Sequence, residues 1–371
     1  MRERTIIYIL TIALIGTIIG FSAGLFIVSQ PTTSIRLSGT GATFPAPLYQ
    51  KFSQEFDALT GIEVDYVGIG SGGGITQHTA KTVDFAASDP PMTTAEWTAA
   101  PNTLQLPMTI GAIVVAYKLP GISLPLNLTG PVIADIFARH ITNWDNTTLQ
   151  ALNPAITLPN HEITVVHRSD SSGSTAVFTS FLSDESAMWN TTYGASKTIN
   201  WEANTVGAKG NPGVAAYIQG NDYSIGYIEL SYALESTIDY ALVANADGFF
   251  INCDLETVAA ASAFASLTLP AGDQDWSSVG NYFALSTGCG NNTYPISSFS
   301  YMLVYKELNV IPGITLIKAQ ALTNWLWWCT HQAQSYAPAL HYVEIPSAVI
   351  SINEASLRSI TFDGAVVNTW Q

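Results

Sequence analysis

The sequence contains 371 residues, of which 47% are hydrophobic, and it is long enough to form two domains with sizeable cores. Its formal net charge is −15, and it has only 13 lysines and arginines, with no basic run. This composition excludes a nucleic-acid partner. Any anion that the protein binds must be held by local donors, because the overall field of the protein repels it.

The first 30 residues differ in composition from the rest of the chain. Arg2 and Arg4 precede an uncharged, mostly apolar run, residues 6–28, which in helical form would cover the roughly 30 Å hydrocarbon core of a bilayer. We therefore predict that residues 1–30 form a transmembrane helix that anchors the remainder outside the cytoplasm. A cleaved signal peptide, which would leave a periplasmic or secreted protein, is the alternative, although its apolar core is usually only about 7–15 residues long.

The three cysteines, Cys253, Cys289 and Cys329, match no zinc or redox motif. They allow at most one disulfide within the chain. We expect either ordinary buried thiols or one bridge between Cys253 and Cys289. The sequence therefore indicates neither a metal site nor a cofactor.

After a short linker, residues 31–34, short β-branched runs alternate with amphipathic stretches, a pattern typical of α/β proteins. The predicted strands are residues 35–38, 62–67, 83–87, 112–117, 163–167 and 224–228. Helices are predicted between them, for example at 47–59, 175–182 and 212–219. No internal sequence repeat is visible.

Three segments share one design, in which a strand ends in small polar residues and a helix follows at once. They are 39–45 (Gly-Thr-Gly-Ala-Thr-Phe-Pro), 68–74 (Gly-Ile-Gly-Ser-Gly-Gly-Gly) and 168–175 (Arg-Ser-Asp-Ser-Ser-Gly-Ser-Thr). The first turn of a helix carries unpaired backbone N–H groups and the positive end of the helix dipole, so hydroxyl and glycine residues there can cradle an oxyanion. Each segment alone could be an ordinary capped helix start, but the three together with Arg168 favour an anion site.

Two catalytic or cofactor interpretations also start from these segments. Gly68, Gly70 and Gly73 match a dinucleotide-binding fingerprint, with Asp89 at about the expected distance. That fingerprint normally follows the first strand of its unit, whereas another strand and helix precede this one. A phosphatase or hydrolase with Ser71 or Ser172 as nucleophile is disfavoured, because the sequence has no G-x-S-x-G elbow and no histidines at metal-ligand spacing. We therefore expect a binding protein and not an enzyme, with no catalytic residues.

Several motifs resemble those of the periplasmic phosphate-binding protein of ABC phosphate uptake systems, and the resemblance covers nearly everything after the linker. They lie at 41–47 (Gly-Ala-Thr-Phe-Pro-Ala-Pro), 68–71 (Gly-Ile-Gly-Ser), 83–89 (Val-Asp-Phe-Ala-Ala-Ser-Asp), 143–145 (Asn-Trp-Asp), 168–180, 213–217 (Gly-Val-Ala-Ala-Tyr) and 225–229 (Ile-Gly-Tyr-Ile-Glu). The resemblance implies capture of inorganic phosphate and its delivery to an ABC permease complex. A phosphate sensor or scavenger without a transporter is the alternative role.

The resemblance also implies a phosphate site, made of Thr43, Phe44, Ser71, Asp89, Arg168, Ser172, Gly173 and Ser174, with Asp170 holding Arg168 in orientation. Asp89 would accept a hydrogen bond from protonated phosphate, whereas fully ionised sulfate would meet it as an unpaired like charge. Two positions depart from many bacterial members, which often have Thr at the place of Ser174 and Gly at that of Ser171. Both changes keep or add a hydroxyl, so we expect altered affinity and not lost function.

The fold implied by the resemblance is a two-lobe α/β periplasmic-binding-protein fold with hinge strands, preceded by the N-terminal helix. The apolar runs 112–117 and 299–305 would cross between the lobes. The first lobe would comprise 34–116 with 296–371, and the second 117–295. Closure of the lobes would bury the ion, and opening at the permease would release it. We expect a monomer.

Overall fold

The computed structural model describes residues 35–265, 269–283 and 289–367. The predicted N-terminal helix, residues 1–30, lies outside these described residues. Within the described ranges, none of the helices combines the length and the apolar character needed to cross a membrane. The described residues form one compact unit.

A nine-stranded sheet runs through the described part of this unit, and its first half joins strands from both ends of the chain. This half has the order β2 (Glu63–Gly68), β1 (Arg36–Gly41), β3 (Phe85–Ser88), β12 (Ser297–Tyr305) and β4 (Thr103–Lys118). β1 is parallel to β2 and β3, whereas β12 is antiparallel to β3 and β4. The carboxyl ends of the three parallel strands therefore meet at one edge of the sheet.

The second half of the sheet has the same strand topology around its parallel strands. Beyond β4 come β8 (Ser224–Glu229), β6 (Thr164–Arg168) and β7 (Val206–Ala208), with β9 (Asp239–Tyr240) also paired to β4. β6 is parallel to both β7 and β8, as β1 is to β2 and β3. In each half the chain goes from the middle strand to one neighbour and returns across it to the other. The structure thus contains a topological repeat that the sequence did not reveal.

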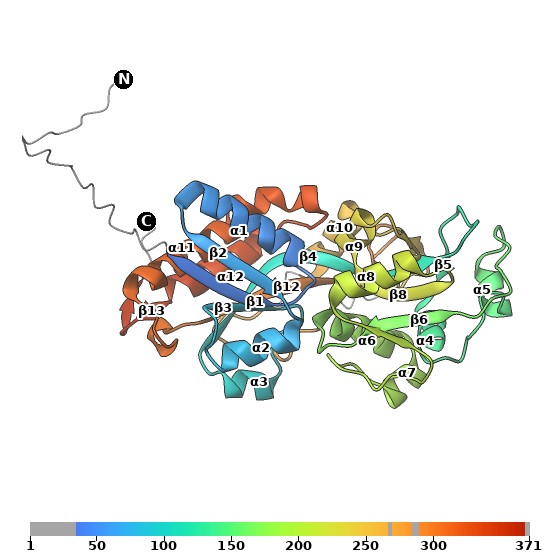
Figure 1. The fold of residues 1–371 in the computed structure, drawn as a ribbon, viewed down its shortest axis with the longest axis horizontal. Helices are drawn as coiled ribbons and strands as arrows, with labels where there is room; N and C mark the ends of the chain where they lie inside the picture. Colours follow the sequence, from blue (N-terminus) through green and yellow to red (C-terminus); the bar gives the residue numbers. More distant parts are fainter. Residues whose placement is uncertain (1–34, 266–268, 284–288, 368–371) are drawn as a thin grey trace, which may run out of the picture. The chain divides into compact units, whose positions relative to one another are not determined.

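Four helices follow the strands of these two repeats. They are α1 (Ala46–Thr60) and α2 (Ser71–Thr79) in the first half, and α6 (Gly173–Glu185) and α8 (Gly210–Gly220) in the second. Because crossover connections are right-handed and the two crossovers of each repeat run in opposite directions, the two helices must cover opposite faces. In Figure 1, α1 lies above β1 and β2 while α2 lies below them. All four helices begin at the edge where the parallel strands end.

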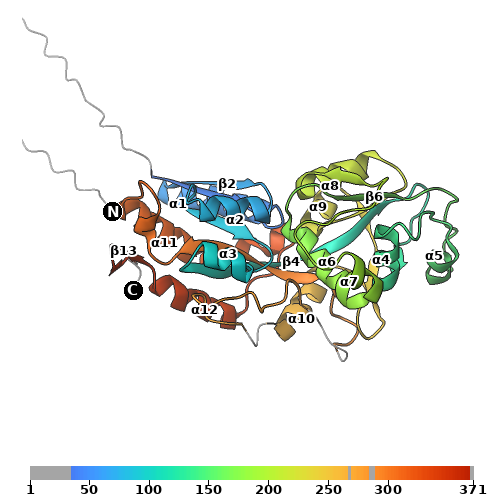
Figure 2. The ribbon, with the colours of Figure 1, turned by 90° about the horizontal axis from the view of Figure 1, so that it is seen from below.

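β4 belongs to both halves of the sheet. Residues 103–112 pair with β12, and residues 113–118 pair with β8. Figures 1 and 2 both show β4 running from the region of β1–β3 into the region of β6 and β8. The prediction of a strand at 112–117 was therefore correct but incomplete, since the strand begins nine residues earlier, at Thr103.

The remaining elements complete the two sides of the sheet. The other helices are α3 (Thr94–Ala99), α4 (Gly130–Phe137), α5 (Thr147–Leu152), α7 (Ala187–Thr192), α9 (Leu230–Glu235), α10 (Leu255–Ala265), α11 (Leu316–Thr330) and α12 (Ser347–Arg358). Short strands β5 (Asn127–Leu128), β10 (Leu242–Ala244) and β11 (Phe250–Ile251) form a small second sheet, and β13 (Thr361–Phe362) pairs with β14 (Ala365–Val366). The cysteines Cys253, Cys289 and Cys329 are buried free thiols, so of the two alternatives the bridge between Cys253 and Cys289 is wrong.

Each half has its own aromatic core. In the first, Trp325 of α11 packs edge-on against Phe56 of α1, with ring centroids 5.3 Å apart. In the second, Phe178 of α6 stacks on Tyr227 of β8 at 4.4 Å. These buried rings fix α1 and α6 against the sheet. They thereby fix the position of the first turn of each helix.

Candidate functional site

The helix starts of the two halves contact each other. The N–H of Gly72 in α2 donates to the carbonyl of Ser171 at 3.0 Å, and the N–H of Asn211 in α8 donates to Thr43 Oγ1 at 3.1 Å. Tyr232 Oη donates to the carbonyl of Thr43 at 2.7 Å. Segments from β1, β2, β6 and β7 therefore converge on one buried place between the halves.

Thr43 and Phe44 lie between β1 and α1, in a turn that depends on Gly41. Gly41 has φ +145°, and a Cβ there would lie 2.1 Å from the carbonyl oxygen of Ala87, so glycine is needed. Its own carbonyl accepts the N–H groups of Ile69 and Gly70 at 2.8 and 2.9 Å, which braces the turn before α2. Thr43 and Phe44 are both buried.

Ser71 and Asp89 form the carboxyl corner of the site. The N–H of Asp89 donates to Ser71 Oγ at 3.2 Å, and Ser300 Oγ on β12 donates to Asp89 Oδ1 at 3.1 Å. Burial raises the pKa of Asp89 to about 7, against the hydrogen bond from Ser300 and the charge of Arg168, which lower it. Asp89 is thus a carboxyl group that can either accept or donate a hydrogen bond near neutral pH.

Arg168 forms the cationic corner. Its Nε and Nη2 donate to Asp170 Oδ1 and Oδ2 at 2.8 and 2.6 Å, and its Nη1 donates to Ser174 Oγ at 3.3 Å. Burial by itself would raise the pKa of Asp170, but the hydrogen bonds and charge of Arg168 outweigh it, so the pKa lies below its ordinary value. The guanidinium of Arg168 is therefore held by two hydrogen bonds to Asp170 and one to Ser174.

Ser172 and Gly173 place the start of α6 against the carboxyl corner. Ser172 Oγ accepts the N–H of Thr175 at 3.1 Å and so caps the helix. A Cβ on Gly173 would lie 2.3 Å from both Asp89 Oδ2 and Ser71 Oγ. Gly173 therefore allows the start of α6 to approach the carboxyl group of the opposite half closely. The structure brings all nine predicted residues to this one place.

Three further residues at the site were not predicted. Asn211, at the start of α8, is fully buried and donates through Nδ2 to Thr43 Oγ1 at 3.1 Å and Ser174 Oγ at 3.2 Å. Glu229 ends β8, and its Oε2 accepts a hydrogen bond from Tyr342 Oη at 3.0 Å. The signal for Asn211 was its place directly before Pro212 at a predicted helix start, whereas Tyr342 offered none.

The glycine-rich turn before α2 serves the contact between the halves. Gly70 has φ +93°, and a Cβ there would lie 2.3 Å from Asp170 Oδ2. A Cβ on Gly72 would lie 2.1 Å from Ser171 Oγ. These two glycines therefore make room for the loop that carries Asp170 and Ser171, and of the three glycines of the fingerprint-like motif only Gly70 has this role.

Space for solvent reaches one edge of the site. A groove of about 480 Å³ lies beside it and is lined by residues of both halves, among them Thr43, Gly68, Pro212, Tyr232 and Glu235. Lys51 and Gln50 of α1 also line this groove. The groove therefore gives solvent access to this edge of the site, where the two halves meet.

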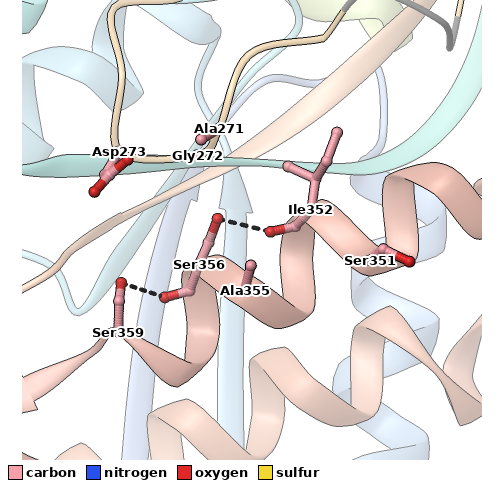
Figure 3. Close-up of a pocket in the computed structure, with 8 residues that line it drawn as sticks. All are labelled: Ala271, Gly272, Asp273, Ser351, Ile352, Ala355, Ser356 and Ser359. Carbon is pink, nitrogen blue, oxygen red and sulfur yellow. Dashed lines mark hydrogen bonds between the residues drawn. The ribbon is translucent and has the colours of Figure 1, made fainter.

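A second cavity, of about 390 Å³, lies between α12 and residues 271–273 and has a different character (Figure 3). Ser356 Oγ donates to the carbonyl of Ile352, and Ser359 Oγ donates to that of Ser356, so both hydroxyls are used on the helix itself. Its one charged lining residue, Asp273, pairs with Lys306 at 3.1 Å. This cavity lacks converging donors and does not suit an anion.

The chemistry of the site is that of binding a small, partly protonated oxyanion. Hydroxyl, amide and guanidinium donors converge, and Asp89 supplies an acceptor among them. Within residues 35–265, 269–283 and 289–367, no group of three or more His, Cys, Asp or Glu side chains could hold a metal ion. A carboxyl group amid donors suits an anion that still carries a proton.

Comparison with known proteins identifies the class of protein that has this fold. A family model described as "PBP superfamily domain" matches residues 28–332, more than half of the chain. The solved periplasmic phosphate-binding protein PfluDING, bound with phosphate, covers 86% of this chain and 93% of its own at a TM-score of 0.67 and 20% identity. The chain thus has the two-domain α/β fold of periplasmic binding proteins, as predicted.

Closer relatives define the family. The phosphate-binding protein PstS of Xylella fastidiosa is 36% identical over 329 residues, which are 88% of this chain and 86% of that protein. PstS of Methanocaldococcus jannaschii is 34% identical over 346 residues, 89% of this chain and 87% of that protein. The chain therefore belongs to the family of phosphate-binding proteins named PstS. Its relatives are named as binding proteins, so the expectation that it is not an enzyme is confirmed at the level of the family.

Proposed function

We propose that this protein binds inorganic phosphate for uptake by an ABC phosphate permease complex. The observation that carries the proposal is the buried carboxyl group of Asp89, which lies against Ser71 and Gly173 at the place where Arg168, Ser174 and Thr43 also converge. Membership of the PstS family supports the same conclusion.

Asp89 would act as the filter for the anion. Phosphate at neutral pH keeps at least one proton and can donate a hydrogen bond to the carboxylate, whereas sulfate has no proton to donate. A buried acceptor that faces an acceptor costs about 1–3 kcal/mol, and more when both are charged. A site that demands a hydrogen bond can reject an analogue that lacks it by about 10⁴–10⁵-fold. The proposal thus assigns selectivity to Asp89 and affinity to the surrounding donors.

The proposal gives Thr43, Phe44, Ser71 and Asp89 to a first lobe, 34–116 with 296–371, and Arg168 and residues 172–174 to a second, 117–295. The pairing of β4 supports this division, because β4 exchanges β12 for β8 as its partner between Ala112 and Ile113. β12 would supply the second hinge strand. Opening about these strands would separate the helix starts and release the anion.

We further propose an extracytoplasmic monomer that residues 1–30 tether to the membrane, with a cleaved signal as the alternative. The apolar run at 6–28 and the arginines before it support this part of the proposal. The net charge of −15 speaks against a nucleic-acid partner and makes capture by local dipoles necessary. No cofactor is part of the proposal.

The test is calorimetric titration of the full chain, purified in a non-ionic detergent without phosphate, with phosphate and then with sulfate. At pH 8.5, where the carboxyl group of Asp89 is ionised and phosphate still carries one proton, we expect one phosphate per chain and no heat from sulfate. Asp89→Asn should gain sulfate binding, because the amide can donate to the fully ionised anion. Asp65→Asn, a substitution on the exposed edge of β2, is the matched control. Absence of phosphate binding by folded wild-type protein would refute the proposal.

A further inference from the structure

Asn211 lies where three segments of the site meet. It is the second residue of α8 and is fully buried. Its side chain contacts Thr43 of the first half and Ser174 of the second, and its own N–H also donates to Thr43 Oγ1.

The orientation of the Asn211 amide is fixed by the backbone. Its Oδ1 accepts a hydrogen bond from the N–H of Glu229 at 3.2 Å. A backbone N–H can only donate, so the atom that faces it must be the oxygen. Nδ2, which can only donate, therefore faces the two hydroxyl groups.

The Thr43 hydroxyl can act toward any further partner only as a hydrogen-bond donor. A hydroxyl group has two acceptor positions and one donor hydrogen. Thr43 Oγ1 accepts from both the N–H and Nδ2 of Asn211, each at 3.1 Å, so both acceptor positions are filled. Its hydrogen remains to be donated to another acceptor.

Both acceptor positions of the Ser174 hydroxyl are also filled. It accepts from Asn211 Nδ2 at 3.2 Å and from Arg168 Nη1 at 3.3 Å. Arg168 is itself fixed by its two bonds to Asp170. Both hydroxyls can therefore serve an anion only as donors, and neither can turn an acceptor toward it.

We propose that Asn211 is a positioning and specificity residue of the anion site, which makes the hydroxyls of Thr43 and Ser174 obligatory donors. This inference rests on the proposed function. Without Asn211, each hydroxyl could rotate and present a lone pair to the ligand, which would weaken binding of an anion that offers mainly acceptors. Asn211 need not touch the anion to have this effect.

A merely structural role would consist of joining α8 to the β1–α1 turn. The two roles differ in how substitutions combine. If Asn211 acts through the two hydroxyls, removing them must also remove its effect on phosphate affinity. If it only holds the fold together, its effect must persist without them.

The test is a double-mutant cycle measured by phosphate titration of the full chain in detergent. Asn211→Ala should weaken binding about 30-fold in the wild-type background, the equivalent of about two modest hydrogen bonds. In the background of Thr43→Val with Ser174→Ala, the same substitution should change affinity less than about 2-fold. Asn211→Asp, which keeps the bond to Glu229 but cannot donate, should weaken binding more than Asn211→Ala.

Asn153 offers a matched control. It is buried, donates through Nδ2 to the carbonyls of Leu149 and Asn127 at 2.9 and 3.2 Å, and accepts the N–H of Asn127 at 2.8 Å. Asn153→Ala should lower the melting temperature of the ligand-free protein and leave phosphate affinity unchanged. If Asn211→Ala does not fold, Asn211→Leu, which is of similar size, uncharged and unable to donate, takes its place in the cycle.

The outcomes separate this inference from the proposed function. Wild-type protein that binds no phosphate would overturn the proposed function and this inference with it. Phosphate binding by the wild type, with the same loss from Asn211→Ala in both backgrounds or with no loss in either, would overturn the inference alone. A loss confined to the background that has both hydroxyls would support it.

Discussion

The two halves of the sheet share one topology and place different side chains at equivalent positions. β1, β2 and β3 correspond to β6, β7 and β8, since each set has the order second, first, third. The segment after the first strand carries Thr43 in one half and, in the other, Asp170 to Ser174, directly after Arg168 at the end of β6. The second helix begins with Ser71 in one half and with Asn211 near its start in the other. The third strand leads to Asp89 in one half and to Glu229 in the other.

The carboxyl groups show what this difference does. Burial raises the pKa of Asp89 to about 7 and that of Glu229 to about 8. Asp89 lies against Gly173 of the opposite half, whereas Glu229 accepts from Ser231 and Tyr342. Arg168, the cation of the site, is already paired with Asp170. A shared topology therefore supplies the helix starts, and single side chains decide which carboxyl group lies against a helix start of the opposite half.

Removing the guanidinium group of Arg168 should have the largest effect among the substitutions that test this difference between the halves. Arg168→Ala should weaken phosphate binding at least about 1000-fold and lower the free energy of unfolding, because it removes the guanidinium donor and leaves the largely covered carboxylate of Asp170 without its cation. Calorimetry and urea unfolding measure the two effects. Arg168→Ala with Asp170→Ala should recover stability but not affinity. Recovery of affinity in the double variant would show that the second half contributes no cation to binding.

Substitution of the two aspartates of the site should change the free energy of unfolding in opposite directions. Asp89 has a pKa raised from 3.8 to about 7, so ligand-free stability falls as pH rises between about 4 and 7. Asp170 has a lowered pKa, so its stabilisation is present above 3.8 and is lost in more acidic solution. At pH 8, Asp89→Asn should stabilise the protein by roughly 2–4 kcal/mol, at about 1.4 kcal/mol per pKa unit, and Asp170→Asn should destabilise it.

Urea unfolding in phosphate-free buffer from pH 5 to 8.5 tests this contrast. The wild-type free energy of unfolding should decrease toward pH 8, and Asp89→Asn should flatten the part of the curve below about pH 7. Destabilisation by both substitutions at pH 8 would show that Asp89 is as well compensated as Asp170. The expected contrast between Asp89, destabilising when ionised, and Asp170, stabilising when ionised, would then be contradicted.

Closing the gap at Gly173 tests the contact between the halves. Because a Cβ there would lie 2.3 Å from Asp89 Oδ2 and Ser71 Oγ, Gly173→Ala should hold the halves apart and weaken phosphate binding about 30-fold, or about 2 kcal/mol. Gly220→Ala, at a position with no atom within 4 Å of an added Cβ, is the control and should leave affinity unchanged. Equal affinity in both variants would mean that binding does not need this approach.

The sequence predicted most of the fold because its strand and helix patterns are local. The predicted strand at 62–67 is β2 with its ends shifted by one residue, and the helix at 47–59 is α1. The first part of β4 was not predicted, and it contains Pro107, a residue type that is rare in central strands. In the structure the pairing with β12 shifts register between Ser300 and Tyr301, where Met108 is the extra residue, so the proline sits beside a bulge.

The site was predictable to the extent that its residues lie in contiguous motifs. Thr43, Ser71 and Asp89 each follow a strand, and Arg168 ends one, within a distinctive segment. Asn211 acts through atoms 168 and 37 residues away, Thr43 Oγ1 and Ser174 Oγ, and no local pattern records such contacts. The repeat of β1–β3 in β6–β8 is likewise visible only once the strands are paired.

The smallest effect is expected at the second buried carboxyl group. Glu229 Oε2 accepts from the N–H of Ser231 at 2.9 Å and from Tyr342 Oη at 3.0 Å, and its backbone N–H holds Asn211. Glu229→Gln keeps the backbone bond and the size of the side chain, so phosphate affinity at pH 7 should change less than about 3-fold, or under about 0.7 kcal/mol. Calorimetry beside Asp89→Asn measures the contrast. A loss above about 30-fold would mean that both carboxyl groups act on the anion, and the two halves would then be equivalent in chemistry as well as in topology.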